Sequence, residues 1–230
     1  SLPNKDLKLN KKKENTTYSK SNRGLLYDRN GRLLATNIFI YNLKAYPRKI
    51  NNPEKTVNLL KREINIMEKD TLTKIKNKKM YEVLIKKNIT EPEAKRINSL
   101  GIPGLEFYPV KKRFYLHKNF TAHYIGHIND SWEGRSGAER SFNKLLSKGQ
   151  NINLSIDIRV QYAVREELKK ASNKFRSKSA TAIIADIDSG EIISLVSIPD
   201  FNPNNSIDPE KNSYRNTATL NLYEMGSTFK

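Results

Sequence analysis

This chain of 230 residues contains no cysteine and no apolar run long enough to cross a membrane. It has three histidines. Without cysteine there is no disulfide bond and no thiol catalysis, and the composition is compatible with a location outside the cytoplasm. A membrane-spanning helix would need roughly 18 apolar residues in succession. His123 and His127 have the i,i+4 spacing of a helical metal pair, but no H-E-x-x-H pattern surrounds them. We therefore expect structural histidines, no metal and no cofactor.

Acidic residues are few: 24 Asp and Glu stand against 42 Lys and Arg, which gives a formal net charge of +18. Such an excess is compatible with a nucleic-acid partner, with an anionic membrane surface or a phosphate-bearing lipid substrate, and with a surface that is simply well solvated. Because no recognisable nucleic-acid reading motif accompanies the charge, we expect no nucleic-acid partner.

Residues 1–22 are polar and basic, with a run at Lys11-Lys12-Lys13. They resemble neither a signal peptide, which has an apolar core, nor a folded element. We expect a basic stalk or linker here, and we expect the membrane anchor to lie outside this sequence.

Residues 23–150 carry the patterns of an irregular, separate domain. The dipeptide Asn30-Gly31 between two apolar stretches predicts a hairpin over residues 23–35. Further extended segments are expected over 38–45, 81–85 and 104–115.

Three helices are expected in the same region. Asn52 as N-cap before Pro53 marks the first, and Thr90 with Glu93 forms a capping box for the last. Asp70 is expected to cap a short helix between them. The remaining markers are the apolar face Val57, Leu60 and Ile64 of the first helix, the end of the second at Ile75 and the end of the third near Gly101.

The pattern changes at residue 151. Residues 152–156 are expected to form a strand, and Asp157 to cap a long helix that ends near Ser172. The buried stripe of this helix is expected to consist of Val160, Val164 and Leu168.

Two β-branched runs, 180–187 and 191–198, predict a hairpin with Gly190 in the left-handed region of its turn. A strand, a helix, this hairpin and then a helix that bears Ser227 predict the opening of an α+β domain over residues 151–230.

Ser227 and Lys230 form a serine-x-x-lysine pair, which is how one family of acyl-transfer enzymes activates its nucleophile. Residues three apart lie on one face of a helix, about 5 to 6 Å apart between Cβ atoms, so the amine can reach the hydroxyl. Lysine serves as the base only if burial or nearby positive charge lowers its pKa. Ser141 and Lys144 repeat the spacing, so the spacing alone does not identify a nucleophile.

Several motifs in a fixed order carry a resemblance that none carries alone. They are Arg23-Gly24, Asp28-Arg29-Asn30-Gly31, Arg113-x-Tyr115, Ala122-His123-x-Ile125-Gly126, residues 134–139 with Phe142, 154–157, 186–192, 197–204, Arg215-Asn216 and 224–230. From Arg23 onward the chain resembles a class B penicillin-binding protein, a peptidoglycan D,D-transpeptidase.

The resemblance implies an α+β fold in which an elongated, non-catalytic pedestal (dimerisation-like) domain over 23–150 is followed by the N-terminal part of a transpeptidase domain, of the serine β-lactamase type, over 151–230. It places Ser141 within a pedestal motif and makes it non-catalytic. The motif residues that it implies hold the pedestal together are Arg23, Gly24, Asp28, Arg29, Gly31, Gly137 and Glu139.

By the same resemblance, Ser227 is the acyl-enzyme nucleophile and Lys230 its proton acceptor. The implied substrate is the D-alanyl-D-alanine end of a peptidoglycan stem peptide, which is cross-linked to an amine of a neighbouring strand. β-Lactams would acylate the same serine because they mimic that substrate.

Within the family, residues 154–157, Pro203-Asn204-Asn205 and the short spacing from Arg215 to Ser227 resemble the division-specific septal type more than the elongation type. The septal type implies a membrane-embedded glycosyltransferase of the SEDS family and other division proteins as partners. It also implies a location at the inner (cytoplasmic) membrane, with the bulk of the protein on the periplasmic side.

The sequence departs from the family pattern in a few places. Met225 and Leu116 stand where proline is usual, and the connection between Gln150 and Asn151 is shorter than usual. The Ser-x-Asn and Lys-Thr-Gly motifs of the family would follow Lys230, so the sequence as written is not expected to catalyse. Two alternatives are a non-catalytic scaffold that binds division partners and a serine β-lactamase or β-lactam sensor, although the latter would not explain the N-terminal motifs.

Overall fold

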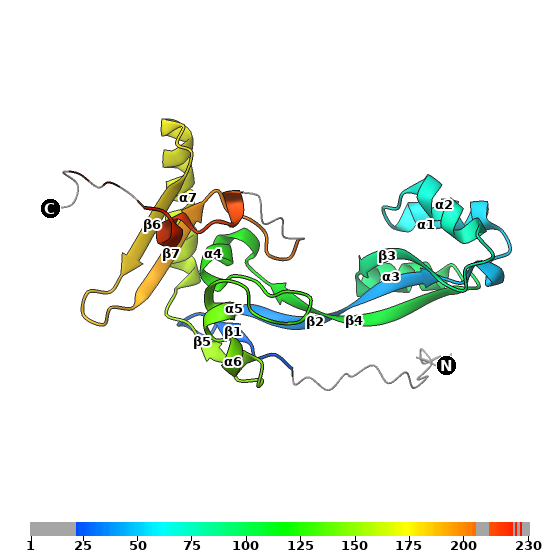
Figure 1. The fold of residues 1–230 in the computed structure, drawn as a ribbon, viewed down its shortest axis with the longest axis horizontal. Helices are drawn as coiled ribbons and strands as arrows, with labels where there is room; N and C mark the ends of the chain where they lie inside the picture. The colour runs from blue at the N-terminus through cyan, green and yellow to red at the C-terminus, as the bar shows by residue number, and fades with distance from the viewer. Residues whose placement is uncertain (1–21, 206–211, 223, 225, 227–230) are drawn as a thin grey trace, which may run out of the picture.

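The computed structural model describes residues 22–205, 212–222, 224 and 226. The molecule is elongated: two lobes are joined by the long antiparallel ribbon of β2 (Leu33–Ala45) and β4 (Leu105–Tyr115) (Figure 1). Strand β1 (Leu26–Tyr27) pairs with the start of β2 and confirms the hairpin around Asn30-Gly31. The second strand of that hairpin and the segment expected over 38–45 are one continuous strand, β2.

The distal lobe, which we define as residues 46–104 with the adjoining ends of β2 and β4, contains three α-helices, the 3-10 helix η1 (Pro47–Lys49) and β3 (Val83–Ile89). Helix α1 (Pro53–Glu63) begins as predicted, because the Asn52 side chain accepts a hydrogen bond from the Lys55 amide at 2.9 Å. The capping box of α3 (Glu91–Ser99) is confirmed. Helices α1 and α3 pack their apolar faces on the sheet. The buried residues of this contact are Leu43 and Ile89 of the strands and Leu60, Ile64, Ala94 and Ile97 from the helices and the end of α1.

Two boundaries in this lobe differ from the predictions. Helix α2 (Glu68–Lys76) starts before Asp70, which lies in its first turn and pairs with Lys74, where a carboxylate favours the helix dipole without capping it. Strand β3 begins at Val83 rather than at Tyr81, because its ladder with β2 starts at the pair Ala45 and Val83. The ring of Tyr81 instead packs edge-on against Tyr46.

The proximal lobe, which we define as residues 22–32 and 116–157, surrounds the other end of the ribbon. Strand β1 pairs parallel to β5 (Ile152–Asn153), so the sheet order is β3-β2-β1-β5, with β4 also on β2. The strand expected over 152–156 is shorter because the chain turns toward α7 after Asn153 and buries Leu154 and Ile156 in the core. The short helices of the proximal lobe are η2 (Lys118–Thr121), α4 (Ala122–Ile125), α5 (Gly137–Ser141) and α6 (Asn143–Leu146).

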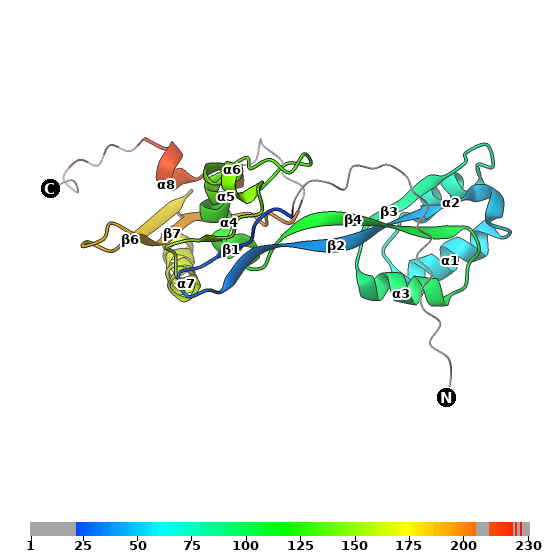
Figure 2. The same cartoon turned by 90° about the horizontal axis from the view of Figure 1, so that it is seen from below.

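Helix α7 (Ile158–Phe175) lies against the hairpin of β6 (Ala180–Ala185) and β7 (Ile192–Ile198) at the end of the molecule opposite α1 to α3 (Figure 2). Asp157 caps α7 as predicted, since its side chain accepts from the Arg159 amide. The predicted stripe was wrong: Val160, Val164 and Leu168 are only partly buried. The face that packs on β7 carries Ile158, Gln161 and Arg165, because polar side chains bind the strand and its following loop.

The β6–β7 hairpin is confirmed, with Gly190 in the left-handed region at φ +72°. Both strands are shorter than predicted because the Asp186 side chain accepts from the Ser189 amide and folds residues 186–191 into the turn. After β7, the chain forms η3 (Asn212–Tyr214) and α8 (Thr217–Leu220). Among the described residues, no helix combines the length and apolar character that crossing a membrane requires.

Candidate functional site

The predicted nucleophile Ser227 and its base Lys230 lie outside the described residues. The structure describes the chain that leads toward them and the pedestal motifs beneath it. The remaining predicted site residues lie at the junction of the proximal lobe with α7 and the β6–β7 hairpin.

Arg23, Arg113 and Glu139 form a buried ionic group, here called the junction cluster. One Glu139 oxygen accepts from Arg23 Nη2 at 2.6 Å, and the other accepts from Arg113 Nε at 2.8 Å. The Glu139 side chain is fully buried and both guanidinium groups are almost so. The cluster therefore joins three segments far apart in the sequence through charges that water cannot screen.

One carboxylate cannot neutralise two guanidinium groups, so both arginines also donate hydrogen bonds to neutral oxygen atoms. Arg23 Nη1 donates to the Trp132 carbonyl at 3.0 Å and to the Asn143 side chain at 2.9 Å. Arg113 Nη1 donates to the Gly24 carbonyl at 2.8 Å, while its Nη2 is buried without a hydrogen-bond partner among the described residues. The site thus holds two cations against one carboxylate.

Gly24 and Gly137 allow the backbone segments around this cluster to approach closely. A Cβ on Gly24 would lie 1.8 Å from the Gln150 carbonyl oxygen, and one on Gly137 would lie 2.5 Å from that of Tyr124. Gly137 also has φ +54°, a conformation that side chains disfavour. Any larger residue at these positions would force the segments apart.

The turn at residues 28–31 connects the pedestal motif to the region after residue 151. The buried Asp28 accepts from the Asn30 and Arg32 amides at 2.8 Å, which shapes the turn that Gly31 completes at φ +76°. Its other oxygen accepts from the Ile158 amide, at the start of α7, at 3.3 Å. Arg29 extends the connection through its amide to the Ile156 carbonyl at 3.0 Å.

Asp157 strengthens the same connection from the other side. Its carboxylate accepts from the Arg159 guanidinium at 2.6 Å and from the Asn30 amide side chain at 2.9 Å. These hydrogen bonds, that of Arg159 foremost, hold the pKa of Asp157 well below its ordinary value. The cap of α7 is therefore ionised throughout the neutral pH range.

The sequence reasoning did not single out Gln161, and it gave Asn204 only as a motif residue, without the contacts that either side chain makes. Gln161 accepts from the Leu195 amide at 3.0 Å and donates to the Leu195 and Phe120 carbonyls at 2.7 and 2.9 Å, which fixes α7 to β7. Asn204 pairs with both backbone groups of Tyr115, at 2.9 and 2.8 Å. The i,i+4 spacing of Asp157, Gln161 and Arg165 was an available signal for a polar face; Asn204 offered none about its partner.

Helix α8 is fixed just ahead of the predicted nucleophile. Asn216 caps it by accepting from the Ala218 amide at 3.1 Å. The buried hydroxyls of Thr217 and Ser197 lie 2.7 Å apart and hold α8 on β7. Position and direction of the chain at Leu220 are thus set by the β6–β7 hairpin.

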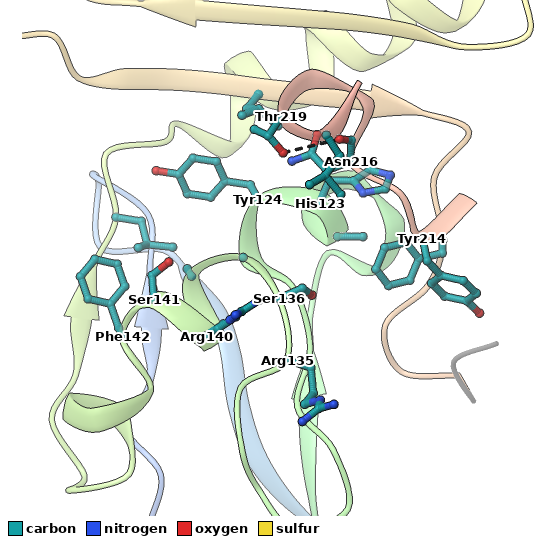
Figure 3. A pocket seen from close by; sticks show the side chains of 17 residues that line it. His123, Tyr124, Arg135, Ser136, Arg140, Ser141, Phe142, Tyr214, Asn216 and Thr219 are labelled. Atoms are coloured by element: carbon teal, nitrogen blue, oxygen red, sulfur yellow. Dashed lines mark hydrogen bonds between the residues drawn. The ribbon is translucent and has the colours of Figure 1, made fainter. Parts of the chain in front are cut away.

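Between α4, α5, β7 and α8 lies an open cavity of about 500 Å³ (Figure 3). Ser141, which repeats the serine-x-x-lysine spacing, lines it from the end of α5. His123 bonds the Pro199 carbonyl at 3.2 Å, and burial lowers its pKa. His127 lies beyond the end of α4 and bonds the Ser136 hydroxyl at 2.9 Å, so both histidines have protein partners.

Comparison with protein families decides the affiliation. The family described as the penicillin-binding protein dimerisation domain matches residues 18–156, and the penicillin-binding protein transpeptidase domain matches residues 180–230. The chain belongs to the penicillin-binding proteins. This confirms the predicted family and the order of an α+β pedestal before the start of a transpeptidase domain. The exact boundaries at residues 22/23 and 150/151 stay predictions.

Curated relatives and solved structures agree with this family. The chain is 33% identical over 213 residues to a probable peptidoglycan D,D-transpeptidase FtsI of Caulobacter vibrioides, with 90% of this chain and 36% of the relative covered. It is 27% identical over 242 residues to peptidoglycan D,D-transpeptidase FtsI of Escherichia coli K12, covering 91% and 41%. The chain thus spans about two-fifths of the length of these relatives or less.

Among solved structures, penicillin-binding protein 2X from Streptococcus thermophilus superposes with a TM-score of 0.58 at 20% identity, covering 85% of this chain and 37% of that one. At this identity the likeness establishes the fold of the penicillin-binding protein and no more.

Proposed function

We propose that this penicillin-binding protein is a septal-type peptidoglycan D,D-transpeptidase, to which the chain contributes the pedestal and the start of the catalytic domain. The observation that carries the proposal is the transpeptidase-domain match over residues 180–230, which includes the Ser227-x-x-Lys230 motif. The relatives named as D,D-transpeptidases support the same activity.

In the proposed reaction, the Ser227 hydroxyl attacks the carbonyl carbon of the penultimate D-alanine, and Lys230 accepts the proton. The peptide bond breaks, the terminal D-alanine leaves with a proton on its nitrogen, and an ester remains on Ser227. An amine of a neighbouring stem peptide then attacks the ester, forming the cross-link and restoring the hydroxyl. A β-lactam would react in the first step and leave a stable ester.

The pedestal motif residues have a positioning role in this proposal. The junction cluster and the turn at residues 28–31 join the pedestal to α7, and α7 is held on β7 by Gln161. Since α8 is attached to β7 through Thr217, the pedestal and α8 form one continuous set of contacts.

We further propose the septal assignment, the partners and the location together. The motifs at 154–157 and 203–205 favour the septal over the elongation type. That type implies a SEDS-family glycosyltransferase and other division proteins as partners, and a location at the inner membrane with the bulk of the protein in the periplasm.

Labelling with a fluorescent penicillin tests the activity in the natural protein that carries this chain. Ser227→Ala is expected to abolish covalent labelling while the circular dichroism spectrum and melting temperature stay unchanged. Ser141→Ala is the matched control, because Ser141 has the same spacing to a lysine, and it is expected to label normally. Labelling that persists in Ser227→Ala would refute the assignment, and failure of the unmodified protein to label would favour a non-catalytic scaffold.

A further inference from the structure

The end of the distal lobe carries a concentration of positive charge that the proposed catalytic function does not use. We call it the basic tip: Arg48, Lys49, Lys78 and Lys79, with the exposed Met80 and Tyr81 beside them. It is formed by η1 and by the connection between α2 and β3, at the end of the molecule away from the β6–β7 hairpin (Figures 1 and 2).

The two segments of the basic tip are bound to each other. Arg48 Nε donates to the Lys78 carbonyl at 3.0 Å, and Lys78 Nζ donates to the Ile50 carbonyl at 2.7 Å. The rings of Tyr46 and Tyr81 meet edge to face with centroids 5.4 Å apart. The charges of η1 and of the α2–β3 connection are therefore presented together on one surface.

Two carboxylates close to the tip in the sequence are paired with other lysines, and a third, Glu106, accepts a hydrogen bond from the Tyr108 hydroxyl at 3.2 Å. Glu54 binds Lys76 at 2.6 Å and Glu82 binds Lys44 at 2.5 Å. Within the described part of the chain, no ion pair joins Arg48, Lys49 or Lys79 to a carboxylate. Lys49 Nζ lies 4.8 Å from the centroid of the Tyr46 ring, a contact that does not neutralise its charge. The excess positive charge is thus available to an external anion.

The exposed apolar groups identify the kind of anionic partner. Tyr81 is 74% exposed and Met80 is 47% exposed, directly beside the cations. Tyrosine is enriched where a bilayer meets water, and lysine and arginine near an anionic leaflet are each attracted to it. We propose that the basic tip binds the surface of a membrane that contains anionic phospholipid.

This contact would have a geometric consequence for the whole molecule. The tip and the β6–β7 hairpin lie at opposite ends of the β2–β4 ribbon (Figure 1). A tip bound to lipid headgroups would hold the hairpin, and α8 with it, away from the membrane surface. The proposal does not depend on transpeptidase activity, and penicillin labelling does not test it.

Co-sedimentation of the full chain with large vesicles of phosphatidylcholine, with or without about one third phosphatidylglycerol, tests the proposal at an ionic strength of about 0.1 M. The tip variant Arg48→Gln/Lys49→Gln/Lys79→Gln is expected to bind the anionic vesicles about 100-fold more weakly than the unmodified chain, because three attracted charges are lost. Vesicles of phosphatidylcholine alone are expected to bind neither the unmodified chain nor the tip variant.

Two variants that lose the same three charges elsewhere serve as controls. One is Lys169→Gln/Lys174→Gln/Lys178→Gln at the opposite end, and the other is Lys11→Gln/Lys12→Gln/Lys13→Gln in the basic N-terminal segment. Both are expected to retain most of the binding. An equal loss in the three variants, or a larger loss in either control, would overturn the proposal.

Tyr81→Ser separates a lipid surface from a soluble polyanion. It is expected to weaken vesicle binding severalfold and to leave binding of inorganic polyphosphate unchanged. If polyphosphate competes fully and Tyr81→Ser has no effect on vesicles, the tip recognises an anionic polymer and the lipid proposal is wrong.

Discussion

Glu139→Gln is the most direct test of the junction cluster. The substitution keeps the size of the side chain and removes the carboxylate that is ion-paired with both Arg23 and Arg113. Both guanidinium groups would stay buried, and the new amide would direct a donor toward one of them. Removing one partner of a buried ion pair costs about 3–5 kcal/mol, because an uncompensated charge remains.

We expect Glu139→Gln to lower the free energy of unfolding by about 4 kcal/mol, at the middle of that range because neutral carbonyls still solvate both arginines. For a chain of this length the melting temperature should fall by about 10 °C. Circular dichroism melts and urea titrations at neutral pH measure both quantities.

The matched control is Glu91→Gln, which removes a carboxylate paired with Lys95 at 2.8 Å on the exposed surface of α3. It is expected to leave the melting temperature unchanged, since solvent screens such pairs. The double variant Glu139→Gln/Arg113→Met should recover part of the loss, because the orphaned cation is removed with its partner. A Glu139→Gln protein as stable as the control would refute the view that this buried charge group holds the junction.

Two further substitutions test the attachment of α7. Gln161→Leu should lower the free energy of unfolding by about 3 kcal/mol, because it leaves the Leu195 backbone groups buried without partners. Asn173→Leu, on the exposed face of the same helix, should change it little. Equal urea midpoints for the two variants would contradict this reasoning. Asp157→Ala should cost about 0.5–2 kcal/mol at pH 7 by loss of the cap. Because Arg159 lowers the pKa of Asp157, that contribution is complete above about pH 4 and declines as the pH falls below it, so the difference from the unmodified chain should narrow in acid.

Local signals were the reliable part of the sequence. The starts of α1, α3 and α7 were predicted because a capping side chain acts within three residues of its own position, as Asn52, Thr90 and Asp157 do. Asp70 was misread because a carboxylate is favourable both as a cap and in the first turn, and only the backbone distinguishes the two.

Apolar periodicity misled at α7. Val160, Val164 and Leu168 have the spacing of a core stripe, yet the helix turns Gln161 and Arg165 toward β7. Hydrogen bonds to a strand more than thirty residues away and an ion pair with Asp200 decide the orientation, and neither is visible in a helical window.

By itself, the sequence determined the family and the order of its two regions, and it gave Ser227 and Lys230 as the proposed nucleophile and base, because the motifs follow one another in a fixed order. It also determined the caps and turns, because these depend on residues close together in the chain. Tertiary structure alone decided that Arg23, Arg113 and Glu139 share one buried site, that β1 pairs with β5, and that the cations of the basic tip gather beside Tyr81. Those arrangements depend on contacts between distant segments, whose free energies arise only when folding removes the groups from water or brings like charges together.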